Sequence, residues 1–599
     1  MKIKILISVF VVIWIIILSR VYYISIKSYA YYEALAKQNA IKTEALSPLR
    51  GSILDIHGRP LAVNKLGFSI GIIPGLSSSR ERKELDKNLD FLVDTLHLNN
   101  KEKLKKRYLK EDSPYSHGFV KVIDFIAYDD LVKSFTKISL NKNLKIEISS
   151  KRYYPYSDLA AHVIGYVGKA NSKEASSDKI AKLTEYAGKT GIEKYYNKVL
   201  EGNPGIKKTN VTAFNVELDV LEKKLPTSEN VSLTLDIELQ KYISQLFKGK
   251  SGAIIVMNAK NGKLLATGSF PEYDLNNFVS GISEVEWKAL SSDFNHPFTN
   301  KLISGLYPPG SIIKMGVALS FLESGLITPN TTIFDTGSIE LGNRKFRDWK
   351  KGGHGRVNLK KAIKESCDTY FYDGSLKVGI DRMTPVLKRL GFGTKSGVDL
   401  PNEFIGIVPG KKWKMNKYQQ PWYQGETLIT AIGQGYFLVT PMQIARYTAL
   451  IATGYGVTPH FVDKVGNLSV VYGKDHTIMS HKDQRYLKEI RTGMYEVANV
   501  PHGTAYYSLH TKFKIAAKTG TAQVVGIPQS EKKRMKENEL EFFHRSHAWL
   551  TTYGPYKNPQ YVVTVLVEHG GHGGSAAGAI VSKIYNKLLE DKYITLKRH

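Results

Sequence analysis

Hydrophobic residues are most concentrated at the N-terminus, where the run "ILISVFVVIWIIIL" begins at Ile5 and is interrupted only by Ser8. Lys2 and Lys4 precede the run, and Arg20 and two tyrosines follow it. The run is slightly shorter than the ~20 residues that a membrane-spanning helix needs, but tyrosine and arginine side chains lie well at a bilayer interface. No small-x-small cleavage site follows, which favours an uncleaved anchor over the alternative, a cleaved signal peptide. The pattern therefore predicts one membrane-spanning helix.

Beyond the anchor, the pattern mixes helical and strand-like periods. Residues 24 to about 45 are typical of a helix leaving the membrane, and "LRGSILDIHGRPLAVN" predicts two strands around a turn. The segment 80–145 is charged and rich in helical pattern. Its run "KEKLKKRYLK" is interpreted as a solvated helix face, with an anionic contact patch as the alternative.

The pattern changes near residue 228. There "NVSLTLDIELQKYISQLF" predicts a strand and an amphipathic helix, and "SGAIIVMNAKNGKLLATGS" predicts buried strands. No second apolar run is long enough to span a membrane. We therefore predict an α+β protein with an anchor at 1–23, a middle domain at 24–227 and a C-terminal domain at 228–599.

Composition narrows the class of protein. The chain is 42% hydrophobic and 23% charged, as globular proteins are. Its net charge of +29 agrees with a lysine-rich proteome, or with attraction to nucleic acid, anionic lipid or an acidic wall polymer. Nucleic acid is set aside because no zinc-finger spacing or RNA-recognition signature is present. The single cysteine, Cys367, allows no intramolecular disulfide, so the fold must rest on core burial.

Candidate chemistry begins at "GLYPPGSIIKM". Pro308, Pro309 and Gly310 fix a bend, and the residues after it look helical. Ser311 and Lys314 are three residues apart and so share a helix face, where the amine can take the hydroxyl proton of a nucleophile. The spacing alone is weak, because it also begins at Ser134, Ser139, Ser176 and Ser530.

Two later segments supply partners. "KKAIKESCDTYFYDGSLKVG" has a helical pattern and holds Ser366 and Asp368, and "KFKIAAKTGTAQV" is an apolar strand ending in Lys518, Thr519, Gly520 and Thr521. The order Ser-x-x-Lys, Ser-x-Asn-like element, Lys-Thr-Gly is that of β-lactam-binding serine enzymes. Another "KTG" at 189–191 precedes Ser311 and lacks an apolar strand before it.

Each element has a physical role in this interpretation. Ser366 relays a proton, Lys518 attracts a substrate carboxylate, and Gly520 leaves room for a substrate backbone at the strand edge. The backbone amides of Ser311 and Thr521 form an oxyanion hole for the tetrahedral intermediate.

With these motifs the chain resembles the class B, high-molecular-weight penicillin-binding proteins, most closely their elongation-specific penicillin-binding protein 2 subgroup. Other stretches that carry the resemblance are "RGSILDIHGRPLA", "GKTGIEKYYNKVLEG", "RDWKKGGHG", "GQGYFLVTPMQIA" and "VEHGGHGGSAAG". Asp368 stands where many members have asparagine, and the elongation subgroup is similar in having aspartate. The resemblance implies an elongated α+β pedestal at 24–227 and a transpeptidase domain at 228–599, whose antiparallel sheet is flanked by helices.

The resemblance also implies a function and partners. Ser311 would attack the D-Ala-D-Ala bond of a peptidoglycan stem peptide, release D-alanine and pass the acyl group to a neighbouring amine, and β-lactams would block it. The protein would lie in the inner membrane with its catalytic domain in the periplasm, beside a SEDS-family, RodA-like glycosyltransferase and an MreC-like scaffold. The alternatives are a septal transpeptidase, a β-lactam sensor and a scaffold with an inactive site. A sensor needs several spans, and an inactive site would be expected to lack one of the motif residues.

Four further residues form a candidate metal site. Asp335, Asp348, His354 and Cys367 are a plausible tetrahedral Zn²⁺ set, with loop aspartates and a buried packing cysteine as the alternative. Elongation-type members are similar in carrying zinc on residues at these positions, so the resemblance favours a structural zinc.

Overall fold

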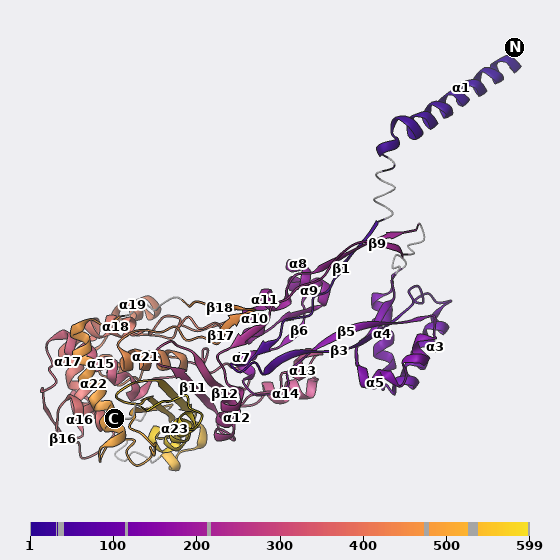
Figure 1. The fold of residues 1–599 in the computed structure, drawn as a ribbon. Helices are drawn as coiled ribbons and strands as arrows, with labels where there is room; N and C mark the ends of the chain where they lie inside the picture. The colour runs from indigo at the N-terminus through magenta and orange to yellow at the C-terminus, as the bar shows by residue number, and fades with distance from the viewer. Residues whose placement is uncertain are drawn as a thin grey trace. The chain divides into compact units, whose positions relative to one another are not determined.

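Figure 1 shows the computed structural model of the chain, which describes residues 2–31, 33, 41–113, 118–212, 217–472, 478–524 and 537–596. The chain forms two compact units, and it passes between them several times. The first comprises residues 1–51, 170–186 and 201–229, and the second comprises 52–169, 187–200 and 230–599. The domain boundaries predicted at 23/24 and 227/228 stay a prediction. Each compact unit combines segments from several parts of the chain, so it has no single boundary that could be compared with them.

The first unit holds the predicted anchor and a small antiparallel sheet. Helix α1 (Lys2–Tyr22) continues into a π-helical turn (Tyr23–Lys27), and the helical stretch Ile3–Lys27 contains an 18-residue window with a mean hydropathy of 2.5 and no buried residues. It is long and apolar enough to cross a membrane. The sheet has the order β1-β8-β9. Its strands and the two short helices of this unit are β1 (Ile41–Leu46), β8 (Gly205–Val211), β9 (Glu217–Lys224), α8 (Ser172–Ser177) and α9 (Lys179–Thr184).

One prediction for this unit is wrong. The helix expected over 24–45 does not include residues 41–46, which form strand β1 and pair with β8 from Ile41↔Asn210 to Leu46↔Gly205. Residues 32 and 34–40 of the expected helix lie outside the described residues. The backbone of β1 finds its hydrogen-bond partners on a strand far along the chain, which a local helical pattern does not reveal.

The second unit contains a seven-stranded mixed sheet with the path β18-β17-β10-β2-β3-β4, on which β5 also pairs with β3. Its strands are β2 (Ile53–Leu54), β3 (Pro60–Ile72), β4 (Val120–Ala127), β5 (Leu144–Tyr153), β10 (Val231–Leu233), β17 (Val462–Val465) and β18 (Leu468–Ser469). Helices α3 (Arg82–Leu96) and α4 (Lys101–Glu111) bury their leucines with β3, β4 and β5 in a small core of their own. The charged run starting at Lys101 is therefore an amphipathic helix with Leu104 and Tyr108 buried.

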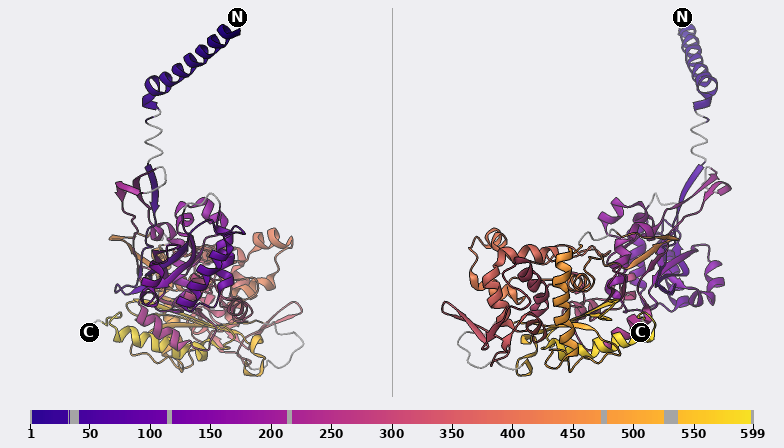
Figure 2. Two further views of the ribbon diagram at one scale, coloured as in Figure 1. Left: turned by 90° about the vertical axis from the view of Figure 1, so that its right-hand side faces the viewer. Right: turned by 60° about the vertical axis from the view of Figure 1, so that its left-hand side comes forward.

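A five-stranded antiparallel sheet forms the centre of the larger core. Its order is β12-β11-β21-β20-β19, so β19 lies at an edge. The strands are β11 (Gly252–Asn258), β12 (Leu264–Phe270), β19 (Ala516–Ala522), β20 (His547–Gly554) and β21 (Tyr561–Val567). Helix α21 (Pro441–Thr453) covers one face and the C-terminal helix α23 (Gly573–Glu590), yellow in Figure 2, covers the other. The consecutive residues Thr551 and Thr552 show this, because the first contacts Thr448 of α21 and the second contacts Tyr585 of α23.

Further helices surround the sheet and complete the predicted α+β class, which is confirmed. Helix α22 (His481–Asn499) packs beside the edge strand β19, and α15 (Lys314–Ser324) packs on α18 (Ile380–Arg389). The remaining helices near the site are α16 (Leu359–Lys364), α17 (Asp368–Val378), α19 (Lys411–Tyr418) and α20 (Gln424–Ala431). Short helices elsewhere in this unit are α5 (Tyr128–Val132), α6 (Phe135–Ser139), α7 (Ala161–Ile164), α10 (Gly191–Tyr195), α12 (Ile237–Leu246), α13 (Asn276–Val279) and α14 (Glu284–Ser291).

Candidate active site

Ser311 lies in a 3₁₀ turn (η2, Gly310–Ile313) that leads directly into α15. Gly310 has φ +55°, and a Cβ at this position would lie 2.7 Å from the Thr521 carbonyl oxygen of β19. Only glycine therefore fits here, and the turn packs against the edge strand. The indole of Trp549 holds the bend by donating to the Pro308 carbonyl at 3.1 Å. The backbone of Ser311 is thus placed beside Thr521, as an oxyanion hole made by their two amides requires.

Lys314 is fully buried at the start of α15. Its Nζ donates to Asp368 Oδ1 at 2.7 Å and to the Ser366 carbonyl at 2.8 Å, and it lies 3.4 Å from Ser366 Oγ. Among the described residues, no hydrogen bond joins Lys314 to the Ser311 hydroxyl. The shared helix face was predicted, but the amine turns toward a carboxylate, because a buried ammonium without a counter-charge is costly.

The sequence predicted one helix through Ser366, and this prediction is wrong. The helix is broken into α16 and α17, and Ser366 lies between them with φ +56°, a left-handed conformation that non-glycine residues seldom adopt. The break directs the hydroxyl to two buried lysines, because Lys518 Nζ donates to Ser366 Oγ at 2.9 Å. Such strained backbone persists where the surroundings over-determine it, and it is concentrated at functional sites.

The Lys-Thr-Gly segment lies on the edge strand β19, as predicted. Lys518 is fully buried; burial, and secondly the charge of Lys314, lower its pKa well below 10.5. Thr519 shares a 2.7 Å hydrogen bond with Thr504, and a Cβ on Gly520 would lie 3.1 Å from the Pro309 carbonyl oxygen. Close packing against the Ser311 turn is therefore one physical reason for the glycine.

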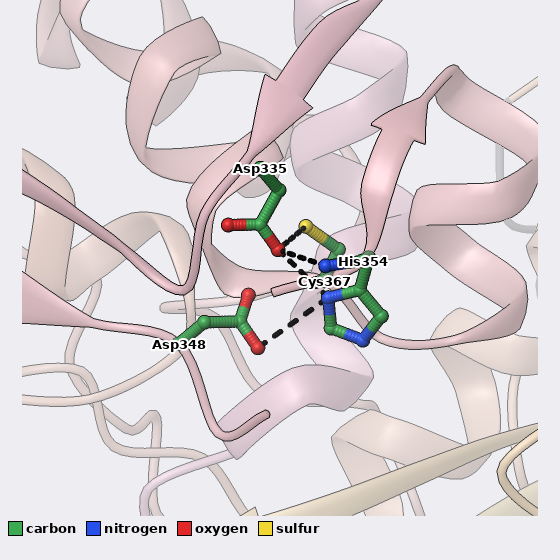
Figure 3. Close-up of side chains that lie close together, drawn as sticks. All are labelled: Asp335, Asp348, His354 and Cys367. Carbon is green, nitrogen blue, oxygen red and sulfur yellow. Dashed lines mark hydrogen bonds and ion pairs between the residues drawn. The ribbon is translucent and has the colours of Figure 1, made fainter. Parts of the chain in front are cut away.

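The four candidate metal ligands come together in one buried cluster. Their ligand atoms lie within 4.8 Å of one another, and Figure 3 shows the side chains converging. Asp335 ends β13 (Ile333–Asp335), Asp348 follows β15 (Arg344–Arg347), His354 precedes β16 (Gly355–Val357) and Cys367 caps α17. His354 Nδ1 lies 2.8 Å from Asp335 Oδ2 and 3.6 Å from Asp348 Oδ1, and Cys367 Sγ lies 3.5 Å from Asp335 Oδ2.

The electrostatics of this cluster suit a cation. Burial, and secondly the charge of Asp368, raise the pKa of Asp348, and burial also raises the pKa of the Cys367 thiol. Against the effect of burial, hydrogen bonds from the Gly337 amide and His354 lower the pKa of Asp335. The set of two carboxylates, an imidazole and a thiol matches the ligand chemistry of Zn²⁺. His354 Nε2 is buried without a partner among the described residues, so nothing on that side fixes the ring tautomer.

The two clusters are joined through backbone. Asp348 Oδ2 accepts hydrogen bonds from the amides of Asp368 at 2.6 Å and Thr369 at 3.1 Å. The amide of Trp349 in turn donates to Asp368 Oδ2 at 3.1 Å. The position of Asp368, and so of the Lys314 amine, depends on the loop that carries Asp348.

Comparison with known proteins identifies the family. The profile described as "Penicillin-binding Protein dimerisation domain" matches residues 45–233, and "Penicillin binding protein transpeptidase domain" matches residues 252–587. The chain belongs to the penicillin-binding protein family. The predicted resemblance to this family is confirmed.

Individual relatives and solved structures show which members of the family resemble this chain over nearly its whole length. The "Peptidoglycan D,D-transpeptidase MrdA" of Escherichia coli K12 is 34% identical over 96% of this chain and 92% of its own length. A solved structure described as a complex between penicillin-binding protein PBP2 and MreC from Helicobacter pylori has a TM-score of 0.85 and 46% identity, with 92% of this chain and 99% of that chain covered. A chain from a study of a peptidoglycan synthase complex has a TM-score of 0.69 and 28% identity, with 97% of each chain covered.

The structure of this penicillin-binding protein also shows site residues that the sequence did not single out. Gln434 donates to the Thr521 carbonyl at 3.1 Å and so holds the end of the edge strand. Behind the Ser311 turn, Tyr307 donates to Glu568 at 2.6 Å, and Glu568 pairs with the buried Lys301 at 2.9 Å. Gln434 and Glu568 occur in "GQGYFLVTPMQIA" and "VEHGGHGGSAAG", two stretches that carry the family resemblance. No motif spacing in these stretches marks the two residues as part of the site. The rival serine Ser530 lies outside the described residues.

Proposed function

We propose that this protein is an elongation-type peptidoglycan D,D-transpeptidase that works through an acyl-enzyme on Ser311. One observation carries the proposal: two buried lysines, from α15 and β19, meet at Ser366 Oγ beside the rigid turn that presents Ser311. Similarity to the peptidoglycan D,D-transpeptidase of Escherichia coli supports peptidoglycan as the substrate. Neither a septal enzyme nor a β-lactam sensor is favoured by the relatives.

The reaction divides into two acyl transfers. Ser311 Oγ attacks the carbonyl carbon between the two D-alanines while its proton passes to Lys314, the proposed general base, which accepts the proton as a neutral amine. The C–N bond breaks, and a proton delivered through Ser366 leaves with D-alanine. An amine of a second stem peptide then attacks the ester carbonyl, its proton returns through the same residues, and Ser311 is released. A β-lactam undergoes the first step only, because its leaving group stays tethered.

The remaining predicted residues have supporting roles. The amides of Ser311 and Thr521 stabilise the oxyanion of each tetrahedral intermediate. Lys518, with Thr519 and Gly520 beside it, attracts the terminal carboxylate. Its lowered pKa also keeps Lys518 close to exchanging a proton with Ser366. Asp368 balances the two lysines and holds Lys314 in place.

Covalent labelling tests this function. The full-length protein in detergent is incubated with a fluorescent penicillin, and unlabelled β-lactam is added as competitor. We expect stoichiometric, competable labelling that survives denaturation. Absence of covalent label from a folded sample would overturn the proposed acyl-enzyme.

We place the protein in the inner membrane, with α1 as a single span and the catalytic unit in the periplasm. Its proposed partners are an MreC-like scaffold that contacts the pedestal and a SEDS-family, RodA-like glycosyltransferase. Support comes from the similarity to a Helicobacter pylori PBP2 in complex with MreC and to a chain from a study of a peptidoglycan synthase complex, and from apolar side chains on the pedestal strands. Leu66 and Ile148 are 60% and 82% exposed there. Ile148→Glu should reduce co-purification of the scaffold, whereas Val471→Glu, which is 91% exposed and lies after the end of strand β18, should not.

We also propose that Asp335, Asp348, His354 and Cys367 hold a structural Zn²⁺. A bound ion would neutralise the clustered acidic groups and tie three loops to the start of α17. It would have no open coordination position, so it is assigned no chemical step. Metal analysis of the purified protein tests this: one zinc per chain is expected. A folded, penicillin-reactive sample without metal would leave Cys367 an ordinary buried thiol.

A further inference from the structure

A cavity of about 360 Å³ lies in the second unit, apart from the serine and metal clusters. This size is within the range of small-molecule sites. Its eleven lining residues are aromatic or uncharged polar residues, with glycine and proline between them, and none is Asp, Glu, Lys or Arg. The residues on which the argument rests are His162, Tyr273, Phe298, Asn300, Asn402 and Phe404.

His162 and Tyr273 form the buried side of the cavity. His162 is 5% exposed, and its Nε2 has no hydrogen-bond partner in the part of the chain that the structure describes. Burial lowers the pKa of His162 to about 4, so the ring is neutral at neutral pH. Its edge meets Tyr273 at 5.2 Å between ring centroids. Less than 1 Å² of the His162 Nε2 atom is accessible, so a ligand in the cavity does not reach it, and His162 contributes to the cavity wall through its packing against Tyr273.

The open side of the cavity is built from exposed but anchored residues. Phe404 is 49% exposed, yet its amide is fixed by a 2.9 Å hydrogen bond to the Ile303 carbonyl. Ser304 donates to the Asn402 carbonyl at 2.9 Å, so the two segments at the mouth are tied together. The Asn402 side chain is exposed and makes no hydrogen bond among the described residues. Phe298 is steadied by stacking on Trp287, with 5.0 Å between the centroids.

The residues that line the cavity favour the sugar over the stem peptide of the proposed substrate. A stem peptide brings carboxylates, and no lysine or arginine lines the cavity to receive them. A sugar ring is neutral, packs its C–H face on aromatic rings, and offers hydroxyl and acetamido groups to amide side chains such as those of Asn300 and Asn402. We propose that this cavity binds an N-acetylated sugar of the peptidoglycan glycan strand. The proposal rests on the proposed transpeptidase function and adds a glycan subsite to it.

The cavity lies within reach of the nucleophile. Ser304 lines it, and the chain runs on from Ser304 to Ser311 over seven residues. The two Cα atoms are therefore at most about 25 Å apart. A strand held in the cavity would keep its own stem peptides at a high effective concentration near Ser311. The site would thus favour donors that are still attached to glycan over free peptides.

The test uses full-length protein in detergent and tri-N-acetylchitotriose as the probe, followed by saturation-transfer NMR, with maltotriose as the sugar control. We expect chitotriose to bind, and Phe404→Ala to weaken its binding about tenfold, equivalent to about 1.4 kcal/mol. Phe294→Ala is the matched control, because Phe294 is 77% exposed and does not line the cavity. Asn402→Asp is the second variant: aspartate tolerates the φ of +65° at this position but places a charge at the mouth.

A second readout compares donors. Phe404→Ala should raise the half-saturating concentration of a glycan-linked donor about tenfold relative to that of a glycan-free stem peptide. Penicillin labelling of wild-type protein in the same samples separates the two proposals, because loss of labelling overturns the proposed function and not the subsite alone. With labelling intact, chitotriose that does not bind, or binds equally to Phe404→Ala and wild type, overturns the glycan subsite. Preferential binding of the free stem peptide also overturns it.

Discussion

Two clusters of buried polar side chains flank the segment from Ser366 to Asp368, and one is richer in basic groups while the other is richer in acidic groups. On one side, the lysine cluster (Lys314, Lys518, Ser366 and Asp368) has two amines for one carboxylate. On the other side, the acidic cluster (Asp335, Asp348, His354 and Cys367) has two carboxylates and a thiol around one imidazole. The Asp368 amide donates to Asp348 Oδ2 at 2.6 Å and so connects the two clusters directly.

The difference between the two clusters indicates what kind of partner each one would bind. Burial, and secondly the charge of Lys314, lower the pKa of Lys518, so that its proton is held less tightly beside Ser366 Oγ. Burial, and secondly the charge of Asp368, raise the pKa of Asp348, and a bound cation would reverse this shift. The first cluster therefore serves chemistry, and the second holds the first in place. The predictions below separate these two roles.

The largest effect is expected at the nucleophile. Ser311→Ala should abolish covalent penicillin labelling without unfolding the protein, because it removes one small, partly exposed hydroxyl. Labelling measured on gels checks this, with Ser176→Ala as control, since Ser176 begins the same Ser-x-x-Lys spacing on an exposed helix. Full labelling of Ser311→Ala would move the nucleophile elsewhere.

The next effect concerns the base. Lys314→Ala should slow acylation by about 10²–10⁴-fold, as loss of a positioned general base does. Because Asp368 then loses its buried partner, a thermal melt must accompany the stopped-flow measurement. Lys179→Ala, the corresponding lysine of the Ser176 control, should react normally. If a folded Lys314→Ala variant acylated at the wild-type rate, the base would be another group.

A smaller effect is expected from the acidic cluster. Chelation of the metal, or Cys367→Ser, should lower the melting temperature and slow acylation about tenfold, because α17 would lose its support while Ser311 and Lys314 stay intact. Zinc content, melting temperature and acylation rate are measured on the same samples. Chelation should have no further effect on Cys367→Ser if that variant already lacks metal. An unchanged melting temperature after complete zinc removal would contradict a structural role.

The smallest effect is a pH dependence of stability. Between its lowered folded pKa and 10.5, Lys518 binds fewer protons in the folded chain than in the unfolded chain. The free energy of unfolding should therefore rise with pH in this window, by up to about 1.4 kcal/mol per pH unit from this group. Denaturant titrations of wild type and Lys518→Met at several pH values measure the difference. Identical slopes for the two proteins would mean that Lys518 has an ordinary pKa.

Much of this architecture was predictable because it follows local or ordered signals. The apolar run after Lys4, the α+β pattern and the order of Ser311, Ser366 and Lys518 all appear in the sequence. The break at Ser366 was not predictable, since its left-handed backbone is imposed by contacts with Lys314 and Lys518 and not by a Gly or Pro.

The other differences between the predicted and the observed structure arise from contacts between residues far apart in the chain. The three-residue spacing places Lys314 on the face of Ser311 but does not reveal that Asp368 receives its ammonium group. Likewise, strand β1 and the cavity that includes His162 and Asn402 are assembled from segments far apart in the chain. No local periodicity records such contacts.

Trapping the acyl-enzyme with a peptide donor tests the central claim most directly. Full-length protein is mixed with a stem peptide ending in D-Ala-D-Ala, quenched with acid and digested, and the adduct is located by mass spectrometry. The account predicts one adduct on Ser311 whose mass is that of the donor's acyl group after loss of one D-alanine, and its disappearance when an acceptor amine is added. An adduct on another residue, or D-alanine release with no covalent intermediate in a folded sample, would contradict it.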